Sequence, residues 1–196
     1  MLVTLSLLLV LPLALAADPP TCAPLATVTF DNATIRGLLG HWVYIAGASR
    51  NPPDQAELKE VKYAAFSFSP GSHEDEFNAI EVMRLNETCV ERNATKILIL
   101  WHNNTLVHVS DHVLSMAELI QNDKDLLIMK HVNANSPSLS FSARTPNITK
   151  EQLEEFKAHL HCLGLTEEDT FFTSEKEACP LPREKTGEGD TEPQLG

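Results

Sequence analysis

The chain has 196 residues, of which 43% are hydrophobic and 21% are charged, a balance typical of globular proteins. Its 15 Lys and Arg residues are outnumbered by 27 Asp and Glu residues, so the formal net charge is −12 at pH 7. This acidic balance argues against nucleic acid or an anionic membrane surface as a partner, because such binding begins with the neutralisation of phosphate charge.

The first seventeen residues have the pattern of a secretory signal. Residues 2–17 are Leu, Val and Ala apart from one Thr, one Ser and one Pro. The run is too short to span a bilayer, and it ends in an A-x-A pattern at residues 14–16 before polar residues follow. We therefore predict a signal peptide over 1–17 and a secreted, extracellular protein.

Four cysteines follow the predicted signal, at Cys22, Cys89, Cys162 and Cys179. In an oxidising compartment an even number of cysteines indicates two disulfides, and the sequence alone leaves all three connectivities open. The wide spacing excludes a CxxC redox or zinc motif.

Five Asn-x-Ser/Thr sequons lie in the same part of the chain, at Asn32, Asn86, Asn93, Asn103 and Asn147. A single sequon often occurs by chance, whereas five behind a signal sequence predict a heavily glycosylated protein. Each asparagine that carries a glycan must then lie at the surface.

The region from residue 42 to residue 144 is a series of short apolar segments separated by turn residues, at intervals of about ten residues. Such a series predicts a meandering antiparallel sheet that closes as a sandwich or a barrel. Residues 112–121 fit either a short helix or another strand. The predicted strands are Trp42–Ala48, Val61–Phe68, Phe77–Leu85, Ile97–Trp101, Leu106–Val109, Leu126–Val132 and Leu139–Ala143.

After residue 148 the hydrophobic period becomes that of a helix. Thr149 and Gln152 form a capping-box pattern, and Gly164 is a natural stop. Between them Leu153, Phe156, Leu160 and Leu163 make one apolar stripe, which predicts an amphipathic helix that packs on the sheet. The residues from 183 to 196 are acidic and lack core residues, which predicts a disordered tail. We thus divide the chain into a signal (1–17), one domain (18–182) and this tail (183–196).

The segment Gly40-His41-Trp42 at the start of the first strand resembles the G-x-W signature of the lipocalins. Glycine would let the chain pass close under the barrel floor, and Trp42 would plug the closed end. Together with the signal, the strands and the late helix, this motif makes the resemblance specific. Further matches narrow it to the alpha-1-acid glycoprotein (orosomucoid) family, which has bird-type egg-white members. These matches are Cys22, Asn32-Ala33-Thr34, Arg50-Asn51, Phe66-x-Phe68-x-Pro70, Thr149–Leu153, Cys162-Leu163 and Cys179-Pro180.

The resemblance implies a mainly β fold, an eight-stranded antiparallel up-and-down barrel with one C-terminal α-helix packed outside it. It also implies two disulfides, Cys22–Cys162 and Cys89–Cys179. Arg144 lies one residue from the place where the resemblance expects a cation stacked on Trp42. In function, the resemblance implies a monomeric carrier of small lipophilic ligands, such as amines or steroids, in plasma or egg white, with an immune-modulating role in the acute phase.

One charged side chain is predicted to lie inside the barrel. By period 2, one face of the third predicted strand carries Phe77, Ala79, Glu81, Met83 and Leu85, and this is its more apolar face. An unpaired carboxylate there tends to take up a proton or a cation, which favours a pocket for lipophilic amines. The alternative is the opposite parity, with Glu81 at the surface.

Other candidate lining residues are Tyr44 and Phe66, which match cavity-lining positions of the family, and Met83, which shares the face of Glu81 by period 2. Met129 and Ser142 lie in the pocket region of the later strands, where the family usually has aromatic residues, so this sequence departs from the family there. His108 stands where relatives can carry an inward Arg, which weakens the case for anionic ligands and leaves a group that charges below about pH 6.5. A satisfied barrel histidine is the alternative.

Three function classes remain. The first is a carrier, and the second is a glycan-bearing scaffold whose cavity is secondary. The third is a lipocalin-type isomerase with a barrel cysteine, which the even cysteine count disfavours. The sequence contains no Ser-His-Asp order, phosphate loop or close carboxylate pair, so we expect no enzyme and no cofactor. The histidine spacing also predicts no metal site, because His159 and His161 fall on different helix faces.

Overall fold

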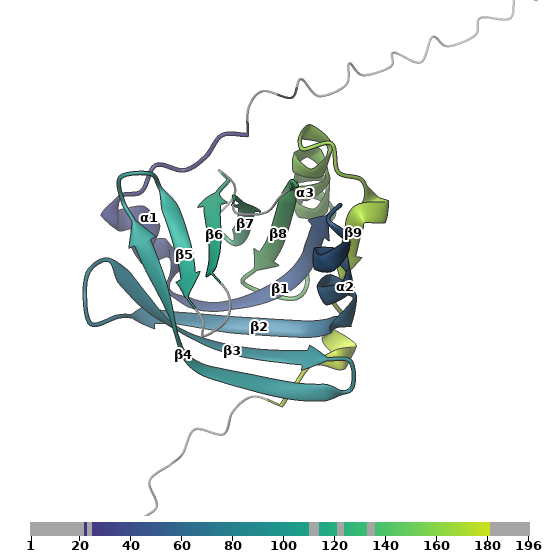
Figure 1. Cartoon of the computed structure of the whole chain (residues 1–196), viewed down its shortest axis with the longest axis horizontal. Helices are drawn as coiled ribbons and strands as arrows, with labels where there is room; N and C mark the ends of the chain where they lie inside the picture. Colours follow the sequence, from purple (N-terminus) through teal and green to yellow (C-terminus); the bar gives the residue numbers. More distant parts are fainter. Residues whose placement is uncertain (1–21, 23–24, 110–113, 121–123, 133–135, 181–196) are drawn as a thin grey trace, which may run out of the picture.

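The computed structural model describes residues 22, 25–109, 114–120, 124–132 and 136–180 (Figure 1). The predicted signal peptide (1–17) and the predicted acidic tail (183–196) lie outside the described residues. None of the helices in the described part of the chain is long and apolar enough to cross a membrane.

Eight antiparallel strands form a closed barrel in which each strand pairs with the next along the chain. The eighth strand pairs with the first, and the first also pairs with the second, so the sheet returns on itself. The predicted eight-stranded up-and-down barrel is confirmed, and the ambiguous segment 112–121 contributes its sixth strand. The strands are β1 (Gly40–Ser49), β2 (Val61–Pro70), β3 (Glu76–Leu85), β4 (Thr88–Leu100), β5 (Thr105–Val109), β6 (Leu114–Leu119), β7 (Leu126–His131) and β8 (Ser138–Ala143).

A ninth strand, β9 (Thr170–Phe172), extends the sheet beside β1. β1 pairs with β2 only over residues 40–44, and β9 pairs with β1 over residues 46–48, where β2 has left it. The backbone N–H of Thr173 continues this contact by donating to the carbonyl of Ile45 over 2.9 Å. β9 thus covers a strand edge that would otherwise stay unpaired.

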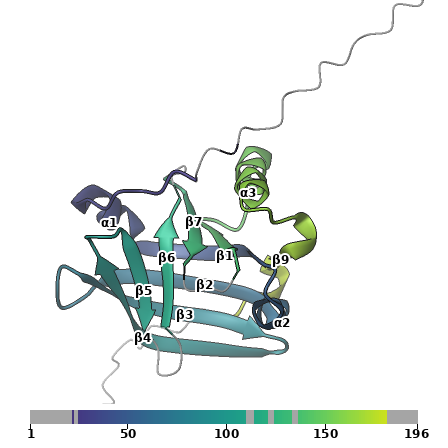
Figure 2. The ribbon, with the colours of Figure 1, turned by 45° about the horizontal axis from the view of Figure 1, so that its top comes forward.

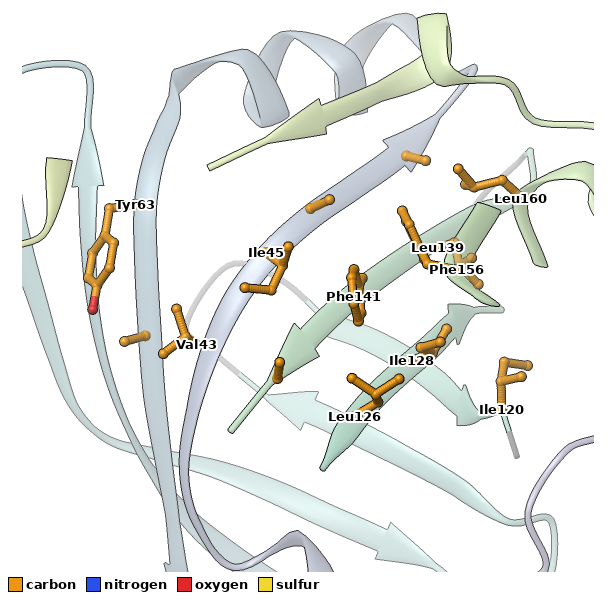
Figure 3. Packing of buried hydrophobic residues seen from close by; sticks show 14 of the residues in the cluster. Val43, Ile45, Tyr63, Ile120, Leu126, Ile128, Leu139, Phe141, Phe156 and Leu160 are labelled. Atoms are coloured by element: carbon orange, nitrogen blue, oxygen red, sulfur yellow. The ribbon is translucent and has the colours of Figure 1, made fainter. Parts of the chain in front are cut away.

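The late helix, α3 (Lys150–Cys162), has the predicted cap and the predicted place. The Thr149 side chain accepts from the backbone N–H of Gln152, and the Gln152 side chain accepts from the backbone N–H of Thr149. Figures 1 and 2 show α3 on the outside of the barrel, and Figure 1 shows it beside β8. Its buried residues are Phe156 and Leu160, and the Phe156 ring stacks on Phe141 of β8 at a centroid distance of 4.7 Å (Figure 3).

Two further helices within the described residues were not predicted. Before β1, α1 (Asn32–Leu38) begins at Asp31, whose side chain accepts from the backbone N–H of Thr34 over 2.7 Å. Residues 50–54, which the sequence predicts as a turn, lead instead into α2 (Pro52–Glu60). α2 buries no residue, so it lacks the apolar stripe that reveals a helix in a sequence. Two short 3₁₀ turns, η1 (Glu167–Asp169) and η2 (Glu175–Glu177), flank β9.

Two disulfides fasten the segments outside the barrel. Cys22 is joined to Cys162 at the end of α3, and Cys89 of β4 is joined to Cys179 after η2, with Cα–Cα distances of 5.1 and 5.9 Å. These are the two pairs that the resemblance implies. All four cysteines of the chain are therefore oxidised.

The closed sheet separates two apolar clusters. The outer cluster lies between the barrel wall and the covering segments, and includes Phe141, Phe156 and Leu160 (Figure 3). The inner cluster, called the floor cluster below, draws on β1 to β7 and on the N-terminal segment. It consists of Phe30, Ile35, Leu38, Trp42, Phe68, Phe77, Ala79, Ile97, Ile99, Leu106, Leu119 and Leu127.

Candidate ligand site inside the barrel

The floor of the barrel is closed around Trp42, which is 1% exposed. Its indole Nε1 donates to the Leu38 carbonyl of α1 over 2.8 Å, and the Arg144 guanidinium carbon lies 3.6 Å from its ring centroid. The same guanidinium donates to the carbonyls of His41 and Gly37 over 2.9 and 2.6 Å. Arg144 itself is therefore the cation that stacks on Trp42. Its two hydrogen bonds also join the end of α1 and the start of β1 at the floor.

Gly40 adopts a backbone conformation that favours glycine. Its φ of +93° lies in a region that side-chain-bearing residues rarely adopt. The glycine of the G-x-W motif thus serves the backbone turn that leads α1 into β1.

Strand register decides which residues face the interior. Residues directly opposite each other in neighbouring strands share a face, and Trp42 lies opposite Phe66, which lies opposite Glu81. By the same rule Tyr44 lies opposite Ser142, Met83 opposite Ala64, His108 opposite Ile97, and Met129 opposite Leu119. All seven predicted lining residues are therefore on the inner face, and Glu81 has the predicted parity.

Exposure differs among the inner-face residues. The floor cluster is buried, and so are Ser140 and Ser142 on β8, whereas several other inner-face residues are only half-buried, as expected where side chains border open space. We call six of these half-buried residues the upper wall. It consists of Tyr44, Phe66, Glu81, Met83, His108 and Met129.

Glu81 is the carboxylate of the upper wall. It lies between Phe66 on β2 and Arg92 on β4 in the strand register, and the Arg92 side chain is exposed. None of the ion pairs among the described residues involves Glu81. A half-buried carboxylate beside an aromatic ring and without a fixed cation is able to bind a ligand ammonium.

A second polar group lies across the barrel on β6, β7 and β8. The His131 ring lies between two serines, with Nδ1 3.4 Å from Ser115 Oγ and Nε2 3.1 Å from Ser140 Oγ. Burial lowers the pKa of the His131 imidazole below its ordinary value, so the ring is neutral at pH 7. Burial likewise raises the pKa of the Tyr44 hydroxyl far above its ordinary value, which keeps it a neutral hydrogen-bonding group.

The rim of the barrel is held by α2. Ser49, at the end of β1, donates to Asp54 of α2 over 2.9 Å, and Gln55 donates to the Ser49 carbonyl over 2.8 Å. A side chain at Gly47 would collide with both the Tyr44 hydroxyl and Leu58 of α2. Leu58 thus reaches over the end of β1 and lies next to the upper wall.

Comparison with known proteins agrees with this geometry. The ApoM domain family matches residues 13–182. The alpha-1-acid glycoprotein of Bos taurus is 34% identical over 190 residues, covering 91% of this chain and 89% of that protein. That of Oryctolagus cuniculus is 31% identical over 185 residues, covering 92% and 91%. The chain belongs to the alpha-1-acid glycoprotein family.

Solved structures place the family fold among the lipocalins. Siderocalin Q83, which has a dual ligand binding mode, matches with a TM-score of 0.62 and 17% identity, over 76% of this chain and 97% of that one. The siderocalin Ex-FABP, which functions through dual ligand specificities, matches with a TM-score of 0.58 and 16% identity, over 70% and 93%. At such identities the likeness shows the fold, and this fold together with the alpha-1-acid glycoprotein relatives supports a ligand-binding carrier.

The sequon asparagines of this alpha-1-acid glycoprotein relative all lie at the surface. Asn32, Asn86, Asn93, Asn103 and Asn147 are exposed. Asn86 also has a φ of +53° in the turn between β3 and β4. Glycans at these positions would extend into solvent.

Sequence reasoning missed part of the polar lining in this family member. Ser115 falls in the ambiguous segment, and His131 falls in an apolar run whose parity the sequence does not fix. The sequence did indicate part of this lining, because polar and apolar residues alternate along Ser138-Leu139-Ser140-Phe141-Ser142 with the period of two that is typical of a strand. In the described part of the chain, no three His, Cys, Asp or Glu side chains gather as a metal site would require.

Proposed function

We propose that this chain is a secreted carrier glycoprotein that reversibly binds one small lipophilic ligand, basic or neutral, against the upper wall of its barrel. The observation that carries the proposal is the contrast on the inner face of the barrel between a buried apolar floor and the half-buried upper wall. Lipocalin-sized barrels of eight strands leave room for one small ligand, and burial of its apolar surface drives binding.

Extracellular placement is part of the proposal. The two disulfides fit an oxidising compartment, and the five exposed sequons fit a glycosylated surface. We place the signal at 1–17 and the carrier domain at 18–182, and we expect a monomer. An acute-phase, immune-modulating role in plasma, or a role in egg white, would depend on ligand binding at this same site and would need no second site.

Trp42 gives the direct test of binding. A Trp101→Phe variant removes the other tryptophan, which is 36% exposed at the turn after β4, and leaves Trp42 as the sole tryptophan reporter in the floor. Three ligands that share a biphenyl group separate the contributions of apolar burial, hydrogen bonding and charge. They are biphenyl, biphenyl-4-methanol and biphenyl-4-methylamine. We expect saturable one-to-one changes in Trp42 fluorescence with all three, at micromolar or lower dissociation constants.

Glu81→Gln should weaken binding of the amine about tenfold and change the affinity for biphenyl less than twofold, because it removes the carboxylate that holds the ammonium. Glu91→Gln is the matched control, since Glu91 lies opposite Val82 on the outer face of the same strand pair and is exposed. Equal losses for amine and hydrocarbon would show that Glu81 does not bind the ligand charge.

The glycan-scaffold function is the second candidate, and the exposure of all five sequon asparagines favours it. It predicts no saturable binding by any of the three ligands. The isomerase alternative loses its nucleophile, because every cysteine of the chain is in a disulfide.

A further inference from the structure

β1 and β2 separate at the upper wall, and a segment from the far end of the chain bridges the space between them. The register of the two strands ends at Tyr44, which lies opposite Ala64. From residue 46 onward β1 pairs with β9 instead (Figure 1), and the backbone N–H of Ser174 donates to the Lys62 carbonyl of β2 over 2.9 Å. We call residues 170–179 the C-terminal strap.

The strap contacts the upper wall through Thr173. The Thr173 hydroxyl donates to the Tyr44 carbonyl over 2.6 Å and lies 3.2 Å from the Ile45 carbonyl oxygen. Both carbonyls belong to the place where β1 leaves β2. Thr173 therefore holds the backbone of an upper-wall residue from outside the eight strands of the barrel.

Little apolar packing holds the strap itself. Within residues 170–179 only Cys179 is buried, and Phe172 is 50% exposed. A cavity of about 180 Å³ borders Cys179 and is lined in part by Tyr63 of β2 and Val82 of β3. Segments with few buried apolar contacts and exposed hydrogen bonds open at a lower free energy than the core. The strap is thus the part of the closed sheet that opens most readily.

The far end of the strap is fastened at one place on the outer face. Cys179 is joined to Cys89, which lies opposite Arg84 in the register of β3 and β4. Arg84 Nε donates to the Glu177 carbonyl over 2.7 Å, and its Nη2 lies 3.5 Å from the Ala178 carbonyl oxygen. The disulfide keeps an opened strap close to its position on β1, which favours rapid closing.

We propose that the C-terminal strap is a side gate of the ligand site, which opens between β1 and β2 to let a ligand pass and closes to retain it. Thr173 is the positioning residue of this gate. The inference rests on the proposed carrier function and adds the control of its exchange rate. A gate changes the path between free and bound states and leaves the two states as they are, so its loosening raises the association and dissociation rates by the same factor.

Thr173→Val tests the gate, because it keeps the shape of the side chain and removes the hydroxyl that donates to Tyr44. In the Trp101→Phe background, stopped-flow mixing with biphenyl is followed by Trp42 fluorescence. We expect both rate constants to rise about 3–10-fold while the dissociation constant stays within twofold. Thr170→Val is the matched control, since the Thr170 hydroxyl donates to the Thr166 carbonyl and not to the barrel. It should change neither rate.

Hydrogen exchange gives a readout that needs no ligand. In Thr173→Val the amides at positions 173 and 174 should exchange about 3–10-fold faster, and those of β8 should keep their rates. Unchanged binding rates, or faster dissociation matched by an equal loss of affinity, would overturn the gate, because the first means another path and the second a supporting role for the wall. Absence of biphenyl binding to the folded parent would overturn the proposed carrier function, and the gate with it.

Discussion

Phe156→Ala is expected to lower the free energy of unfolding by about 3–5 kcal/mol, the range for truncation of a buried aromatic ring. Phe156 is fully buried, and its ring stacks on Phe141 between α3 and the outer wall of β8 (Figure 3). The cavity would remain largely unfilled, because the barrel wall on one side and the capped helix on the other are both held in place. Equilibrium unfolding in urea, followed by circular dichroism, measures the change.

Phe172→Ala is the matched control for this truncation. Phe172 is also a phenylalanine of the C-terminal part and pairs with Ala46, but it is 50% exposed. We expect a loss below about 1 kcal/mol, because most of the removed surface was already in water. Equal losses for the two variants would contradict the packing of α3 on β8.

Removal of the Cys89–Cys179 bridge by alanine at both positions should have the other large effect, a loss of about 2–5 kcal/mol. The bridge joins residues 90 positions apart and fastens the segment after η2 to β4. In the chain-entropy model a loop of this length gives a value of about 4–5 kcal/mol, near the upper end of the measured range. Calorimetry of the parent and the double variant gives the difference.

The second bridge provides an internal comparison. Cys22 and Cys162 are 140 positions apart, and the logarithmic dependence on loop length predicts a difference between the two bridges of only about 0.4 kcal/mol. Both alanine pairs should therefore destabilise the protein by similar amounts. Unchanged stability after removal of Cys89–Cys179 would mean that the C-terminal segment does not depend on it.

The sequence predicts those elements whose periodicity is strong. Alternation along residues 77–85 gave the correct face for Glu81, and the capping box at Thr149 gave the correct start of α3. α2 was missed because it buries no side chain, and β9 because three residues are too few to show a period. β4 begins at Thr88, well before the predicted Ile97, since its first half is largely polar and exposed.

The candidate site could be predicted only in part, for a similar reason. Residues that resemble family lining positions, such as Tyr44 and Phe66, were assigned from the sequence. The link between His131 and its two serines could not be, because it joins β6, β7 and β8 through the register of a closed sheet. An apolar run such as residues 126–132 does not reveal which of its positions face inward.

The carrier function is tested most directly by titration of the Trp101→Phe protein, folded and with both disulfides intact, with biphenyl-4-methylamine. We predict saturable one-to-one quenching of Trp42, at a micromolar or lower dissociation constant, that biphenyl reverses by competition. A flat titration with all three biphenyl ligands would contradict the carrier and leave the glycan-bearing scaffold as the function that the exposed sequons support.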